Sequence, residues 1–227
     1  MLSLVITVLV LLAVMGLAVN YLGLHLAAQV FTAVGTLGVA VLAIWGETIR
    51  ARFAGPKLRF GFDDYDGHLT RYEDGRQTIY YHVKLRNERP WSQARNARVV
   101  CTGISKRASD GSFVPEGVPY PILLTWTPAD FYGPLQTVVH ESTCDLGFLD
   151  QGSAKFTLAH YFWPHDFPGT ISANQAMRVR LIALADNFTS ASTYVLEIHW
   201  DGVWSADPVE MRKHLVIKEV DDTDSKA

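Results

Sequence analysis

The first part of the chain, up to Gly46, contains no Asp, Glu, Lys or Arg. A helix that crosses a bilayer needs about 20 consecutive apolar residues, so this segment has room for two such helices. Asn20–His25, a stretch with polar and turn-forming residues, interrupts the apolar run near its middle. We therefore predict a transmembrane hairpin within residues 1–49, with helices at about 2–20 and 26–46.

A secretory leader is the main alternative for the first helix. Such a leader begins with Lys or Arg and ends at a small-residue cleavage site, whereas the first basic residue here is Arg50. A single span preceded by a cleaved or uncleaved leader therefore stays open as the alternative. A buried hairpin of a soluble protein is disfavoured because the charge-free run is so long.

Basic residues follow the apolar segment and predict its orientation. They lie in and just after the linker 50–56, at Arg50, Arg52, Lys57 and Arg59. Positive charge near a span favours the cytoplasmic side, and the predicted hairpin tip carries only His25. We expect a two-pass protein of the inner (plasma) membrane, with its soluble domain in the cytoplasm and its basic linker near lipid headgroups.

Small residues recur at helical spacing along the second predicted span. They are Thr32, Thr36, Ala40 and Ala43. Small residues let helices approach closely in lipid. This face predicts packing against the first span, and self-association into a homo-oligomer is the alternative use of the same face.

Charge and cysteine content exclude some classes of protein. The net charge is −3, so the basic field of a binder of nucleic-acid polymers is missing. Cys101 and Cys144 are too few for a disulfide framework and are interpreted as small buried hydrophobic residues.

Residues 57–220 show the two-residue period of β-strands. In QTIYYHVKLRN, Ile79, Tyr81, Val83 and Leu85 alternate with more polar residues, which predicts a half-buried strand. Similar runs end in clusters of Pro, Gly, Asn and Asp, as antiparallel strands do. One of them, STYVLEIHW, predicts another half-buried strand, with its inner face at Tyr194, Leu196, Ile198 and Trp200 and its outer face at Val195, Glu197 and His199. We predict an immunoglobulin-like antiparallel β-sandwich, with a β-barrel as the alternative. Pro208–His214 can form a short helix, and the tail 221–227 has a disordered composition.

One passage, VKLRNERPWSQARNARVVCTGI, reads as a strand, a short loop and a second strand. It resembles the V-x-N-x-G…A-x-N-V-x-V strand pair of bacterial immunoglobulin-like adhesion and CARDB-type modules. The expected glycine is absent, and Glu88–Trp91 stands in its place. The resemblance supports a sandwich fold.

The layout of two spans followed by a β-rich cytoplasmic domain resembles many bacterial membrane-anchored proteins. Among them are the two-transmembrane, β-strand-rich effectors of cyclic-oligonucleotide anti-phage systems. In that family the β domain binds a cyclic nucleotide and the membrane helices assemble and disrupt the inner membrane. No residue motif carries this resemblance over to the present chain.

Two short motifs contain residues that bind metals in other proteins. HYFWPHD offers His160, His165 and Asp166 to a metal, but zinc sites use tighter spacing. DDYDG, residues 63–67, lacks the distal Glu of a calcium loop and is interpreted as a turn. No nucleophile elbow or phosphate loop is present. We therefore expect no enzyme activity, no metal and no cofactor.

Aromatic and basic residues in predicted loops are the best candidates for contacts with a partner. They are Trp91, Trp163, Arg89 and Arg95. Trp and Arg are common anchors of protein interfaces and can also stack on bases or hold phosphates. We expect a membrane-anchored binding module that recruits a cytoplasmic protein. The alternative is an effector whose β domain senses a small nucleotide.

Overall fold

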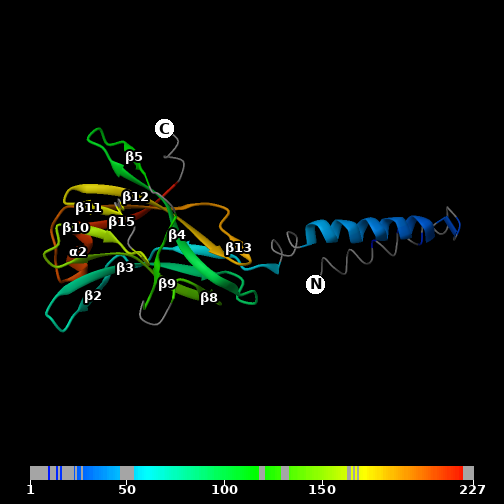
Figure 1. Cartoon of the computed structure of the whole chain (residues 1–227), viewed down its shortest axis with the longest axis horizontal. Helices are drawn as coiled ribbons and strands as arrows, with labels where there is room; N and C mark the ends of the chain where they lie inside the picture. Colours follow the sequence, from blue (N-terminus) through cyan, green and yellow to red (C-terminus); the bar gives the residue numbers. More distant parts are fainter. Residues whose placement is uncertain are drawn as a thin grey trace. The chain divides into compact units, whose positions relative to one another are not determined.

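The computed structural model divides the chain into two units, Met1–Phe53 and Ala54–Ala227. The residues that it describes are 10, 14, 16, 23, 25, 26, 28–46, 54–117, 121–128, 133–162, 165, 167 and 169–221. Figure 1 shows both units, the helix Ala28–Gly46 in blue and the mainly β second unit in the other colours.

The first unit contains one helix that is long and apolar enough to cross a membrane, Ala28–Gly46. It matches the second predicted span, 26–46. The first predicted span, 2–20, lies almost wholly outside the described residues, so a hairpin is not shown. By length and composition, Ala28–Gly46 fits a membrane anchor and also fits a signal sequence near the N-terminus.

The second unit is mainly β and is built from two antiparallel sheets, one of them curled into a half-barrel. The first sheet has the order β1-β3-β9-β10-β11, with β2 beside β3 and β7 beside β9. Its strands are β1 (Leu58–Gly61), β2 (His68–Arg71), β3 (Gln77–Asn87), β7 (Thr125–Trp126), β9 (Glu141–Asp150), β10 (Lys155–Leu158) and β11 (Thr170–Ser172).

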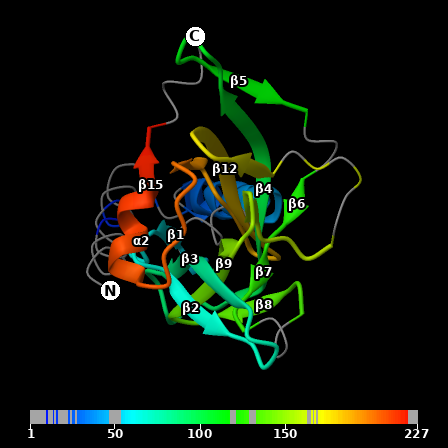
Figure 2. The same cartoon turned by 90° about the vertical axis from the view of Figure 1, so that its left-hand side faces the viewer.

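The second sheet has the order β15-β14-β12-β4-β5. Strand β13 pairs with β12, and β6 and β8 pair with β4. Its strands are β4 (Ala94–Arg107), β5 (Phe113–Glu116), β6 (Ile122–Leu123), β8 (Gln136–Val138), β12 (Gln175–Ala185), β13 (Phe188–Thr189), β14 (Tyr194–Trp200) and β15 (Leu215–Val220). The hairpin of β4 and β5 reaches beyond the rest of this sheet (Figure 2).

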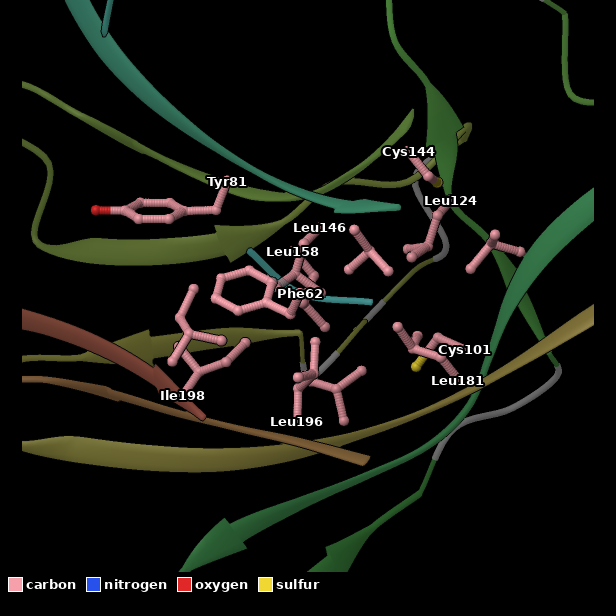
Figure 3. Close-up of a cluster of buried hydrophobic side chains, with 14 of the residues drawn as sticks. Phe62, Tyr81, Cys101, Leu124, Cys144, Leu146, Leu158, Leu181, Leu196 and Ile198 are labelled. Carbon is pink, nitrogen blue, oxygen red and sulfur yellow. The ribbon is translucent and has the colours of Figure 1, made fainter. Parts of the chain in front are cut away.

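The hydrophobic core lies between the two sheets (Figure 3). Tyr81 and Leu146 enter it from the first sheet, and Leu181 and Ile198 enter it from the second; all four are fully buried. The predicted inward residues of β3, Ile79, Tyr81, Val83 and Leu85, all have 0% exposure, which confirms that face. His82, predicted on the outer face, is also buried, at 8% exposure, so the strand is more than half-buried. The prediction of a mainly antiparallel β domain is confirmed, with two sheets of which one is a curled half-barrel.

Two further local predictions are confirmed. Pro208–His214 forms helix α2, where Asp207 caps the first turn by accepting a hydrogen bond from the Val209 backbone N–H at 3.0 Å. Cys101 and Cys144 are free and fully buried. Burial raises the pKa of the Cys101 thiol to about 12 and raises that of Cys144 as well, so both behave as apolar residues.

The prediction that STYVLEIHW forms a half-buried strand is wrong for β14, which is buried on both faces. Its inward residues are buried as expected, but outward-facing Val195 and Glu197 are also only 3% and 2% exposed. Strand β14 lies between β12 and β15, so long side chains from both neighbours cover its outer face. The alternation of apolar and polar residues predicts which face of the strand a residue lies on. It does not predict whether neighbouring side chains bury that face.

Candidate functional site

Three basic side chains surround one buried carboxylate on the outer face of the second sheet. The side chain of Glu197, on β14, is only 3% exposed. Its Oε2 accepts a hydrogen bond from Arg178 Nε at 2.9 Å. Its Oε1 accepts one from Arg107 Nη2 at 2.8 Å and lies 3.1 Å from Lys218 Nζ. We call these four residues the Glu197 cluster.

Strand register brings the cluster together from distant parts of the sequence. Arg178 on β12 pairs directly with Glu197, and Glu197 pairs directly with Lys218 on β15. Ser105 on β4 pairs with Arg178, so Arg107, two residues further along β4, lies on the same face. Residues that pair directly across antiparallel strands share a face and have side chains within contact distance.

The cluster keeps Glu197 ionised. Burial alone raises the pKa of this carboxyl, but hydrogen bonds and charges from Arg178 and Lys218 outweigh it and lower the pKa below its ordinary value. Arg178 is largely buried, whereas Arg107 and Lys218 are partly exposed. Arg107 and Lys218 are therefore the two cations of this face that an anion from solution can reach.

An aromatic ring holds two of these cations in place. Phe113 on β5 lies opposite Arg107 across the hairpin. The guanidinium carbon of Arg178 lies 4.0 Å from the centre of the Phe113 ring, and that of Arg107 lies 5.1 Å from it. Cation–π contacts at these distances restrict the arginine side chains, so the positive groups are arranged before any ligand arrives.

Beside the cluster, the surface forms an open hollow with a volume of about 240 Å³. It is lined by Arg107, Glu197, His199, Val216 and Lys218. The side chains of Arg107 and Lys218 are 40% and 57% exposed, so both can reach a ligand. A hollow with this lining can hold a carboxylate or a phosphate group through charge-assisted hydrogen bonds.

A second cluster joins the loop after β1 to β3 and β9. His82 Nδ1 lies 2.6 Å from Asp64 Oδ2, and His82 Nε2 lies 3.2 Å from Asp145 Oδ1. Thr127 also donates its hydroxyl hydrogen to Asp145. A β-bulge between Tyr81 and His82 shifts the register so that His82 faces Asp145.

The charges in this second cluster favour an imidazolium ion. Burial alone lowers the pKa of His82, but hydrogen bonds to Asp145 and Asp64 outweigh burial and raise the pKa to about 9. Both ring nitrogens therefore donate to carboxylates at neutral pH. The arrangement ties three segments of the first sheet together.

The same cluster contains the only group of three possible metal ligands found among the described residues, Asp64, His68 and His82, whose ligand atoms lie within 4.8 Å of one another. Two atoms bound to one tetrahedral zinc ion at about 2.0–2.1 Å lie more than about 3 Å apart. The 2.6 Å between His82 and Asp64 is instead a hydrogen-bond distance. The set therefore fits an ion pair better than a metal site.

The sequence analysis placed individual residues of both clusters but did not predict that they come together. It placed His82 in a strand and residues 63–67 in a turn, and the turn packs on the strand as a neighbour in space. It placed Glu197 on the outer face of a strand without its cations. The signal that could have found them is strand pairing, which a single sequence does not reveal.

The predicted partner contacts are distributed differently. Trp91 is 75% exposed, on the loop between β3 and β4. Arg95 is exposed nearby at the start of β4, whereas Arg89 donates from Nη1 to the Gly55 carbonyl oxygen at 3.2 Å. Trp163 lies outside the described residues. The structure therefore brings three of the four residues to one end of the domain.

The Trp91 loop has a fixed conformation. Asn87 is 6% exposed, and its Oδ1 accepts hydrogen bonds from the backbone N–H groups of Lys57 at 3.2 Å and Arg89 at 3.0 Å. Its Nδ2 donates to the Ser92 carbonyl oxygen at 2.8 Å. One buried amide thus closes the loop and holds Trp91 outward.

The predicted topology residues are only partly described. Lys57 and Arg59 both lie close to Glu88, at 2.6 Å and 3.6 Å. Arg50 and Arg52 lie outside the described residues. Lys57 and Arg59 therefore belong to the folded domain and pair with the base of the Trp91 loop.

The residues of the predicted small-residue face, Thr32, Thr36, Ala40 and Ala43, are all exposed on the helix Ala28–Gly46. The hydroxyl groups of Thr32 and Thr36 donate to the carbonyl oxygens of Ala28 and Thr32, each at 2.9 Å. Such back-bonding satisfies a hydroxyl group in lipid. Close packing of this face against another helix stays a prediction.

The HYFWPHD motif does not form a complete ligand set in the described part of the chain. His160 packs edge-on against Phe167, with ring centres 5.1 Å apart, and burial lowers its pKa. His165 is exposed, and Asp166 lies outside the described residues. The motif is an aromatic-rich loop between β10 and β11.

No known protein-family model matches the chain, and no curated protein matches it either. The function therefore rests on the helix Ala28–Gly46, the Glu197 cluster and the Trp91 loop.

Proposed function

We propose that this protein is a non-enzymatic, membrane-anchored module whose cytoplasmic β domain recruits a protein partner. The observation that carries the proposal is the hollow beside the Glu197 cluster, where the partly exposed cations Arg107 and Lys218 line an open surface. A partner that presents an acidic segment fits this surface by charge. The helix Ala28–Gly46 supplies the anchor.

The finer features of the anchor belong to the same proposal. The charge-free run supports a second span at about 2–20, and the basic residues that follow support a cytoplasmic domain. The small-residue face supports helix packing in the membrane. Two packed antiparallel sheets support an immunoglobulin-like arrangement.

Sensing of a cyclic nucleotide is the second candidate, because phosphates would be attracted to the same cations. Pockets for ligands of drug size usually have volumes of about 300–1,000 Å³. The hollow, at about 240 Å³, better fits a single acidic side chain or phosphate group than an enclosed dinucleotide. The volume therefore favours recruitment of an acidic protein segment.

The full chain in lipid nanodiscs is expected to bind an acidic probe, a fluorescent hexaglutamate peptide, through the hollow. Replacing Arg107 and Lys218 together by Ala should weaken the affinity roughly tenfold, since two charge-assisted contacts are lost. Wild-type affinity should fall as salt is raised. Titration followed by fluorescence anisotropy measures both effects.

The matched control replaces Arg71 and Lys155, exposed cations of the first sheet, by Ala. This variant should bind like the wild type, and thermal unfolding should show that both variants are folded. Equal affinity in all three proteins would rule out the hollow. Binding of a cyclic dinucleotide that depends on Arg107 and Lys218, without peptide binding, would favour the nucleotide sensor instead.

A further inference from the structure

The Trp91 loop lies beside the point where the chain enters the β domain. The Glu88 backbone N–H donates to the Lys57 carbonyl oxygen at 2.8 Å, and Arg89 bonds to Gly55. Asn87 accepts a hydrogen bond from the Lys57 backbone N–H and donates one to the Ser92 carbonyl oxygen, so the loop that carries Trp91 is joined to the entering chain. The first residues of the domain and exposed Trp91 therefore share one end.

The covalent chain limits how far this end can lie from the predicted anchor. Fully extended, the segment from Gly46 to Gly55 spans at most roughly 30 Å. The end of a spanning helix lies at the headgroup region. The Trp91 loop is therefore tethered within reach of the bilayer surface, where its local concentration is high.

The composition of this end suits an anionic lipid surface. The exposed cations described at this end include Lys57, Arg59 and Arg95, and the carboxylates described there include Glu88, Glu141 and Asp186. The turn at Asp186 belongs to the same end because its backbone N–H donates to the Arg95 carbonyl oxygen at 3.0 Å. Tryptophan prefers the membrane interface, and basic residues are attracted to anionic headgroups.

Trp91 has few alternative roles within the domain. At 75% it is the most exposed of the large hydrophobic side chains in the described part of the chain. Its loop is already closed by Asn87, so the side chain is not needed to hold the fold. An exposed aromatic ring on a fixed loop with cations around it is typical of a contact surface.

We propose that this end of the β domain docks on the anionic leaflet of the membrane, with Trp91 in the headgroup region and the cations around it. The inference rests on the proposed membrane anchor. It assigns Trp91 and Arg95 to lipid instead of to the protein partner. The β domain would then be held in one orientation, with other surfaces left for recruitment.

The test uses the full chain in nanodiscs that contain lipids with brominated acyl chains, which quench nearby tryptophan emission. The difference in emission between the wild type and Trp91→Phe gives the signal of Trp91. The difference between the wild type and Trp45→Phe gives the signal of Trp45, a residue of the helix Ala28–Gly46. We expect both signals to be quenched in anionic nanodiscs. In zwitterionic nanodiscs, quenching of Trp91 should be much weaker and quenching of Trp45 unchanged.

A charge variant sharpens the test. Arg95→Glu should shift the balance between docked and undocked domains roughly fivefold towards undocked. The matched control Arg71→Glu, on β2, should leave the quenching of Trp91 unchanged.

The remaining outcomes separate the two proposals. If the Trp45 signal were quenched and the Trp91 signal were not, docking would be overturned and the membrane anchor would stand. Quenching of neither would overturn both. A Trp91 signal that is shielded from an aqueous quencher but untouched by brominated lipid would overturn docking and assign the face to a protein, including a second copy of this chain.

Discussion

Replacing Glu197 by Gln is expected to lower the free energy of unfolding of the β domain by about 2–3 kcal/mol. The change leaves Arg107, Arg178 and Lys218 together on one face without the carboxylate that holds them. Breaking a buried ion pair costs about 3–5 kcal/mol, and the lower value applies here because Arg107 and Lys218 are partly in water. Urea unfolding in nanodiscs, followed by the emission of buried Trp126 and Trp200, measures the change.

The matched control is Glu116→Gln, an exposed carboxylate on β5 of the same sheet. It should change stability by less than about 0.5 kcal/mol. Because the pKa of Glu197 is lowered in the folded state, its contribution is present above the unfolded pKa and disappears as pH falls through the folded value. If Glu197→Gln were as stable as the control, the cluster would not organise this face.

The stability of the β domain should fall by about 2 kcal/mol as pH rises from 6.5 to 9. The cause is His82, whose pKa is raised to about 9 in the folded protein from an ordinary value of 6.5. A raised folded pKa gives stability that is complete below the unfolded pKa and is lost as pH rises through the folded pKa. The whole pKa shift of His82 would correspond to a larger loss of stability than this. Solvent at the edge of the site screens the charges and reduces the loss.

His82→Gln should remove most of this pH dependence and also lower stability at pH 6.5. The matched control is His214→Gln, which removes a more exposed histidine paired with Asp201 at 2.8 Å. The control should keep the pH dependence of the wild type. Unfolding curves at several pH values test the pair of variants, and an unchanged slope in His82→Gln would show that His82 is not the responsible group.

The sequence was sufficient to predict features that depend on neighbouring residues. The alternation in 77–87 predicted the inward face of β3, and Pro208 after Asp207 predicted α2. These features need no knowledge of which strands pair.

The sites needed that knowledge. Glu197 meets Arg107 only because β12 lies between β4 and β14, and those two residues are 90 positions apart. His82 meets Asp145 only because a bulge shifts β3 against β9. Exposed Trp91 was found from sequence because Pro and polar residues flank it, whereas its link to Gly55 depends on folding of the loop. Long-range register is what a single sequence leaves open.

The location of the C-terminus in intact cells tests most directly whether the β domain is a cytoplasmic module on a membrane anchor. The full chain carries, in separate fusions, a C-terminal reporter that works only in the cytoplasm and one that works only outside. We predict activity of the cytoplasmic reporter alone, with the fusion retained in the membrane fraction after alkaline extraction. Activity of the external reporter, or release of the protein from the membrane, would contradict the proposed function.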